Sequence, residues 1–114
     1  MQRVNEADLP YRGGDSGVKY LMRGPNLDWG VILLKPGEDL AGHYHEQVEE
    51  TFYVVQGQAA FSVNDEEIIV GAGTALRLEP KESHAVRNAG KGDLKLVFIK
   101  WPYLPKDKVS LQGH

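Results

Sequence analysis

Glycine and proline divide this chain into short apolar segments, and this rhythm constrains the fold more than any other feature. The 114 residues include 13 glycines and 6 prolines. These residues recur about every eight to twelve positions, between runs rich in valine, isoleucine, leucine and aromatic side chains. Such side chains fit a pleated, half-buried surface, and no long window has a helical apolar period. The pattern predicts an all-β fold with minimal helix.

Nine segments have the composition of strands. They are residues 18–23, 29–35, 43–46, 51–56, 59–63, 67–70, 75–78, 85–88 and 94–101. The polar stretch 64–66 predicts a hairpin turn. We expect one domain, with an arm over residues 1–17, a barrel over 18–104 and a tail over 105–114. The arm should pack on the barrel or on a partner subunit, and residues 112–114, including His114, should fray.

Composition excludes several classes of protein. There is no cysteine, so disulfides, thiolate metal sites and cysteine nucleophiles are excluded. The formal net charge of −3 gives no reason to expect nucleic acid or an anionic membrane as partner. No apolar stretch is long enough for a membrane span, and the charged N-terminus lacks the apolar core of a signal peptide. We expect a cytoplasmic protein.

Three of the four histidines lie in two compact clusters. His43 and His45 are two positions apart, so on a strand they project from one face and can share a metal ion. A carboxylate from the next segment can add a ligand. Straight alternation from His45 favours Glu49, whereas a turn through residues 46–48 would favour Glu50. His84 would return to the same place on a later strand.

These residues resemble the first motif of the cupin superfamily, G-x5-H-x-H-x3/4-E-x6-G. All of its fixed positions are matched by Gly37, His43, His45, Glu50 and Gly57. The resemblance selects Glu50 over Glu49, because only Glu50 has the required interval to Gly57. It therefore implies a metal site made of His43, His45, Glu50 and His84.

The second cupin motif, G-x5-P-x-G-x2-H-x3-N, is matched in part. Gly73, His84 and Asn88 keep its full spacing. Glu79 stands at its proline, with Pro80 one position later, and Lys81 stands at its glycine. Lysine tolerates a positive φ poorly, so the shape of the turn before His84 is left open.

The resemblance implies a double-stranded β-helix, a jelly-roll barrel of two antiparallel sheets, with one divalent transition metal ion near one mouth. Three imidazoles and one carboxylate suit Fe, Mn, Ni, Cu or Zn. Two coordination positions would remain for water, oxygen or substrate. Cupins of this length often pair, so we also expect a homodimer.

Other side chains are assigned by their strand positions. Tyr44 should point away from the site and pack between the sheets, and Asn88 should be structural. The aromatic residues expected in the core are Trp29, Phe52, Phe61 and Phe98. The polar residues that could bind an anionic substrate, but are expected to face outward, are Gln56, Arg77, Arg87 and Lys100.

Three functions fit these patterns. The first is a metal-dependent enzyme, an oxidoreductase, lyase or isomerase, that acts on a small polar or acidic metabolite. The second is a non-catalytic module that binds or senses a sugar or another metabolite in the same pocket. The third is a metal-stabilised structural protein. The sequence has no second catalytic signature that selects a reaction.

Overall fold

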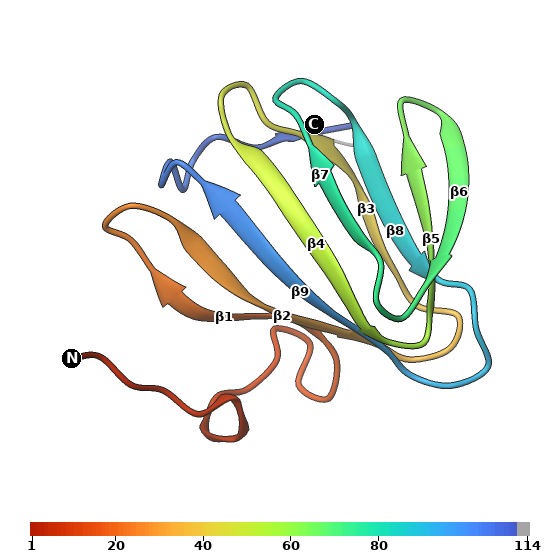
Figure 1. Ribbon diagram of the computed structural model, residues 1–114, viewed down its shortest axis with the longest axis horizontal. Coiled ribbons are helices and arrows are strands. Elements are labelled where there is room, and N and C mark those ends of the chain that lie inside the picture. Colours follow the sequence, from red (N-terminus) through yellow and green to blue (C-terminus); the bar gives the residue numbers. More distant parts are fainter. Residues whose placement is uncertain (112–114) are drawn as a thin grey trace.

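Two five-stranded sheets face each other and enclose the core, as Figure 1 shows in the computed structural model, which describes residues 1–111. The expected fraying of residues 112–114 lies outside the described residues. The elements are η1 (Glu6–Asp8), β1 (Gly17–Arg23), β2 (Asp28–Leu34), β3 (Asp39–Tyr44), β4 (Glu49–Gln56), β5 (Gln58–Val63), β6 (Glu66–Gly71), β7 (Ala75–Leu78), β8 (His84–Asn88), β9 (Leu94–Trp101) and β10 (Val109–Ser110).

The strand order is β1-β2-β9-β4-β7 in one sheet and β10-β3-β8-β5-β6 in the other, and every named pair is antiparallel. The predicted all-β jelly roll with minimal helix is therefore confirmed, since the described residues contain only one 3-10 turn. None of these residues forms a helix long and apolar enough to cross a bilayer.

Two segments differ from the sequence prediction. β3 begins at Asp39 rather than at residue 43, because a bulge between Leu40 and His43 interrupts the alternation that marks a strand. The tail, predicted to lie outside the barrel, supplies β10 as an edge strand beside β3. This strand has only two residues and depends on a distant partner, so local composition does not reveal it.

The core lies between the inner faces of the two sheets. Alternate residues of β9, Leu94, Leu96 and Phe98, are buried together with Phe52 and Phe61. Burying a side chain of this size stabilises the fold by about 1.5–3 kcal/mol. Phe52, Phe61 and Phe98 are therefore core residues as predicted.

The predicted core position of Trp29 is wrong. Trp29 is half-buried, lies outside the core cluster and has the exposed Ile99 as its cross-strand partner. Asp28 and Gly30, its neighbours on β2, are buried. The alternation of β2 therefore turns the indole toward the outer face of the sheet.

The predicted turn at residues 64–66 is a tight hairpin between β5 and β6. Asn64 and Asp65 have φ values of 48° and 68° and separate Val63 from Glu66. Two successive positive φ angles match the twist of the flanking strands, and asparagine and aspartate tolerate this conformation.

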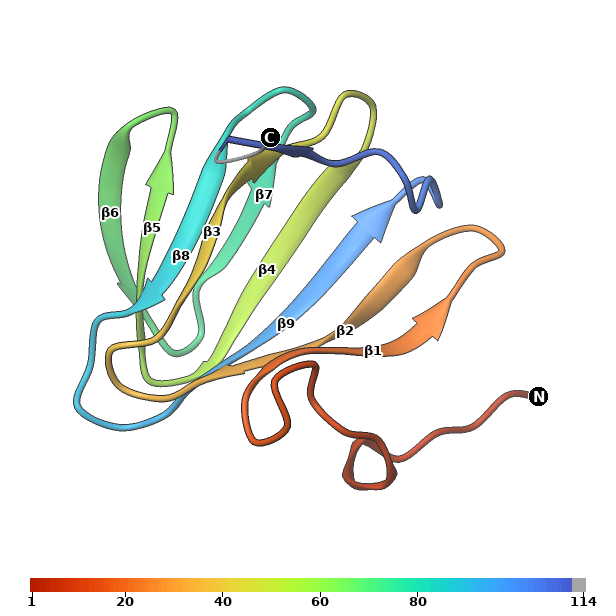
Figure 2. The same cartoon turned by 180° about the vertical axis from the view of Figure 1, so that it is seen from behind.

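The N-terminal arm contacts its own barrel through Glu6 and Tyr11, whereas its first residues are exposed and extend past β1 (Figure 2). Lys19 of β1 is only 6% exposed; its Nζ donates to the backbone carbonyl of Glu6 at 2.7 Å and lies 3.9 Å from the centre of the Tyr11 ring. Lys95 forms an ion pair of 2.7 Å with the Glu6 carboxylate. The contact between Lys19 and Tyr11 holds this part of the arm on the barrel, and the residue after Tyr11, Arg12, lines the barrel cavity.

Candidate metal centre

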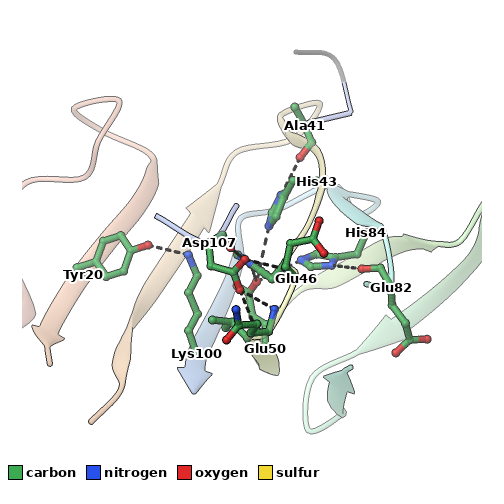
Figure 3. A network of polar contacts seen from close by, with 12 residues as sticks. Tyr20, Ala41, His43, Glu46, Glu50, Glu82, His84, Lys100 and Asp107 are labelled. Atoms are coloured by element: carbon green, nitrogen blue, oxygen red, sulfur yellow. Dashed lines mark hydrogen bonds and ion pairs between the residues drawn. The ribbon is translucent and has the colours of Figure 1, made fainter. Parts of the chain in front are cut away.

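The structure brings the four predicted residues His43, His45, Glu50 and His84 together, at the end of the barrel where β3 ends and β4 and β8 begin. Figure 3 shows His43, Glu50 and His84 of this group. One ligand atom from each lies within 4.8 Å of the others. His43 of β3 lies directly opposite His84, the first residue of β8. His45 follows the end of β3, and Glu50 comes from β4 of the facing sheet.

Glu50 is the centre of this group. Its Oε1 lies 3.0 Å from Nε2 of His45, 3.2 Å from Nε2 of His84 and 3.7 Å from Nε2 of His43. His45, Glu50 and His84 are each at most 5% exposed. The four side chains therefore form one compact, water-poor cluster.

Each imidazole is oriented by a backbone carbonyl on its far side. Nδ1 of His43 faces the carbonyl of Ala41 at 3.3 Å, and Nδ1 of His84 faces that of Glu82 at 3.2 Å. Nδ1 of His45 faces the carbonyl of Asp107, from the segment before β10. A carbonyl only accepts, so each Nδ1 donates there and each ring presents its Nε2 to the cluster.

That arrangement fits a cation. Unprotonated Nε2 atoms and a carboxylate oxygen repel one another unless a proton or a metal ion lies between them. Nε2 of His43 is buried and has no hydrogen-bond partner among the described residues. The donor set of three imidazoles and one carboxylate suits a divalent transition metal, and the carbonyls beyond it are the second contacts that metal-binding histidines usually make.

The charge states of Glu50 and His43 suit the binding of such an ion. Burial alone would raise the pKa of Glu50, but its contacts with the three imidazoles, together with the charge of Lys100, hold it well below its usual value. Burial lowers the pKa of His43, and its contact with Glu50 only partly opposes this. The carboxylate is therefore charged and His43 neutral at pH 7, the states in which both can bind a metal.

Strand alternation explains why Glu50, and not Glu49, enters the cluster. Glu50, Phe52 and Val54 are all buried and share the inner face of β4. Residues 45–48 are not in a strand, so the alternation that begins at His45 does not continue into β4. Glu49 instead takes a half-buried place as the cross-strand partner of Trp101.

The turn before His84 keeps a left-handed residue although lysine replaces glycine. Lys81 has a φ of 72°, and its backbone N–H donates to the carbonyl of His45 at 2.6 Å. The N–H of Glu82 donates to the carbonyl of Glu79 at 3.1 Å. These bonds hold the turn and connect it to the loop that carries His45.

A cavity of about 470 Å³ opens beside the cluster. Its apolar wall includes Ile32, Phe52 and Phe98, and its polar wall includes Tyr20 and Lys100. Lys100 was predicted to face outward, and this is wrong. It is the cross-strand partner of Glu50 and continues the inward series Leu94, Leu96, Phe98 on β9, a signal that is visible in the sequence.

The other three polar candidates face outward as predicted. Arg77 pairs with Glu79 at 3.3 Å and Arg87 with Glu67 at 3.2 Å, and both arginines are about half exposed or more. Gln56 is exposed at the far end of β4. Sequence reasoning missed Arg12 and Lys108, which line the cavity from the arm and the tail, segments without strand periodicity.

Two further predictions concern residues next to the ligands. Asn88 is structural as predicted: it is buried, and its side-chain amide donates to the carbonyls of Leu34 and Gly92 at 2.9 and 2.8 Å. Tyr44 points away from the cavity, but it is half-buried outside the core and does not pack between the sheets.

Comparison with known proteins identifies the family of this chain. The cupin domain model matches residues 30–100. The chain is 32% identical over 81 residues to the polyketide synthase CurC of Streptomyces cyaneus, covering 71% of this chain and 53% of that protein. It is 30% identical over 68 residues to an oxalate-binding protein of Thermotoga maritima, covering 60% and 56% of the two chains.

The structural likeness extends further than the sequence likeness. The polyketide cyclase RemF from Streptomyces resistomycificus superposes with a TM-score of 0.81 at 17% identity, over 97% of this chain and 85% of that chain. This shows a shared fold. The chain spans about half the length of the two curated relatives above. With the matched domain covering most of the barrel, this chain belongs to the cupin family.

Proposed function

We propose that this cupin binds one divalent transition metal ion, Fe, Mn, Ni, Cu or Zn, through His43, His45, Glu50 and His84. The observation that carries the proposal is the common orientation of the three imidazoles. Each Nδ1 faces a backbone carbonyl, so each Nε2 is directed at Glu50. The buried Nε2 of His43, which has no partner among residues 1–111, supports it.

We further propose that the protein is a metal-dependent enzyme acting on a small polar or acidic metabolite. When bound, the ion would act as a Lewis acid or would activate oxygen. The cavity beside the cluster has room for a small molecule. Its apolar wall, with Phe52 and Phe98, would exclude water from the reacting group, while Lys100 and Tyr20, which lie beside Phe98, would orient a polar substrate.

A second candidate is a module that binds a small acid in the same cavity without converting it. The relative from Thermotoga maritima, which is named as an oxalate-binding protein, favours this alternative. Both candidates use the same four residues and the same cavity. They differ in whether the metal-loaded protein turns the bound molecule over.

One experiment addresses the metal and the activity in sequence. The purified protein is treated with chelator, loaded with each of the five metals without oxygen and analysed for metal content. Near-stoichiometric uptake by the wild type, and its loss in His45→Ala, is the expected result. Absence of uptake of every metal by the wild type would overturn the proposal. Small acids are then screened for stabilisation and for turnover, which separates the binder from the enzyme.

We also propose the homodimer that the resemblance implies. Four apolar side chains, Tyr53, Val55, Ile99 and Trp101, are 39–54% exposed on β4 and β9. Exposed apolar groups gathered on adjacent strands are typical of interfaces, and a second copy of the same face can cover them symmetrically.

A further inference from the structure

Besides Arg23, which pairs with Asp28, three cationic side chains line the cavity beside the four-residue cluster. Arg12 comes from the N-terminal arm, Lys100 from β9 and Lys108 from the segment before β10. Three segments far apart in the sequence thus place like charges at one opening. Like charges brought together cost free energy, so their assembly calls for a compensating anion.

The carboxylates of the cavity do not supply that anion. Asp28 already pairs with Arg23 at 3.4 Å. The Asp107 carboxylate accepts backbone N–H groups, and Glu50 is enclosed by imidazoles. Within residues 1–111, no carboxylate lies within ion-pair distance of Arg12, Lys100 or Lys108.

Lys100 is held with its ammonium group inside the cavity. Its Nζ donates to the hydroxyl of Tyr20 at 2.7 Å and lies 5.2 and 5.6 Å from the ring centres of Tyr20 and Phe98 (Figure 3). This hydrogen bond uses one of the three donors of an ammonium group. The remaining donors are available to a molecule that enters beside Glu50.

Lys108 belongs to the same electrostatic environment. Withdrawal of part of its side chain from water lowers its pKa, and the charges of Lys100 and Arg12 lower it further. The attraction of Glu50 opposes this only in part. Lys108 is therefore repelled by the other two cations that line the cavity, and an anion bound between the three would relieve this repulsion.

We propose that Arg12, Lys100 and Lys108 form an anion clamp, which binds an anionic group of the substrate while another polar group of the same molecule reaches the four-residue cluster. This inference rests on the proposed function and deepens it. The substrate class becomes a small acid that carries one anionic group apart from the group at the cluster. The cavity of about 470 Å³ has room for both groups of such a molecule.

Succinamate and succinamide test the clamp, because they differ only by the replacement of the single carboxylate with a neutral amide. Binding of each is measured by calorimetry to metal-free and to metal-loaded protein at constant ionic strength. We expect the wild type to bind succinamate at least about fivefold more tightly than succinamide, the ratio expected for one partly exposed charged contact. This preference should weaken as salt increases.

Variants assign the effect to the clamp. Lys108→Gln and Lys100→Gln should each weaken succinamate binding about fivefold and remove the preference over succinamide, whereas Lys100→Arg should retain it. Lys106→Gln is the matched control, because Lys106 is an exposed lysine of the same segment that does not line the cavity. Thermal unfolding checks that each variant is folded, and Lys108 is exposed enough that its replacement leaves the core intact.

The outcomes separate the clamp from the metal proposal. Equal binding of the two probes, no binding of either, no effect of Lys108→Gln, or an equal effect of Lys106→Gln would overturn the clamp. Metal content is measured on the same samples. If the wild type takes up no metal, the proposed function fails. The preference between the two probes, measured in metal-free protein, still shows whether the clamp exists. If it takes up metal without any preference, the clamp alone fails.

Discussion

Asp107 holds His45 and the loop that follows it at the same time. Its backbone carbonyl accepts the Nδ1 proton of His45, 62 positions away in the chain. Its carboxylate accepts the N–H groups of Glu46, Gln47 and Val48 at 2.9, 2.7 and 3.0 Å. One residue of the C-terminal segment thereby orients an imidazole and shapes the connection from β3 to β4.

We predict that Asp107→Ala weakens metal binding about 10-fold or more, because the loop between His45 and Glu50 loses its three acceptors. The free energy of unfolding should fall by about 1–2 kcal/mol, the effect typical of removing a side chain that caps backbone N–H groups. Metal titration and urea unfolding measure the two effects. Asp93→Ala, which removes an exposed carboxylate from another loop, should change neither. Identical results for both variants would contradict the assigned role.

Acid should weaken the hydrogen bonds that the Asp107 carboxylate accepts from the loop. Burial would raise the pKa of Asp107, but the hydrogen bonds from the backbone N–H groups of residues 46–48 lower it below 3.8. A lowered folded-state pKa means that the stabilisation is complete above the unfolded value and is lost as pH falls through the folded value. The difference in unfolding free energy between wild type and Asp107→Asn should therefore be constant from pH 7 to pH 5 and shrink toward pH 3. A difference that grows with acid would refute this.

Replacement of Glu50 by glutamine should abolish most metal binding, whereas Glu49→Gln should leave it unchanged. Glu50 is buried among the imidazoles, while Glu49 lies beside Trp101. We expect at least about a 100-fold loss of affinity for Glu50→Gln, since even outer contacts of a metal site are worth about 10-fold to 100-fold. Elemental analysis and competition with a chromogenic chelator measure the loss. Comparable losses in the two variants would exclude the assignment of Glu50.

Lys81→Gly should stabilise the protein by about 0.5–1 kcal/mol. The left-handed conformation costs a residue with a Cβ about 1–2 kcal/mol, and glycine removes this cost. Glycine also has a larger entropy in the unfolded chain, which offsets part of the stabilisation. Lys91→Gly is the control, because Lys91 is exposed in a loop and has no positive φ. Thermal unfolding should therefore show a higher Tm for Lys81→Gly and an equal or lower one for Lys91→Gly. A lower Tm in both would argue against strain at Lys81.

A charge on the outer face of β4 should separate the proposed dimer. Tyr53→Lys places an ammonium group among exposed apolar residues, where burial against a second copy would be unfavourable. Light scattering after size-exclusion chromatography should show a dimer for the wild type and a monomer for this variant. Ile69→Lys, at an even more exposed apolar position on the other sheet, should remain dimeric. A monomeric wild type would overturn the homodimer.

The sequence predicted the parts of the site that follow a fixed spacing. His43 and His45 lie near the end of β3, and the interval to Gly57 identified Glu50, whose inward direction follows from the alternation of β4. Lys100 could have been assigned in the same way from the alternation of β9. The outward assignment failed because lysine is usually exposed, whereas here aromatic rings and the Tyr20 hydroxyl surround it.

The remaining parts of the site depend on contacts between distant segments. β10 has two residues, and its position is set by pairing with β3 rather than by its own composition. Arg12 follows from the anchoring of the arm through Glu6, Lys19 and Lys95. Neither segment has a periodic pattern, so the sequence alone could not place their cations beside the cavity.

The contribution of the C-terminal segment affects where the protein can be cut or extended. A fragment from β2 to β9 would keep the four clustered residues, yet it would lose the carbonyl that faces His45 and the side chains of Arg12 and Lys108. Such a fragment could bind a metal, but its metal affinity and its substrate preference would differ from those of the whole chain. An affinity tag fused close behind β10 carries the same risk, because it would disturb an edge strand that lines the cavity through Ser110. Protein for assays should therefore retain both ends of this chain and carry removable tags.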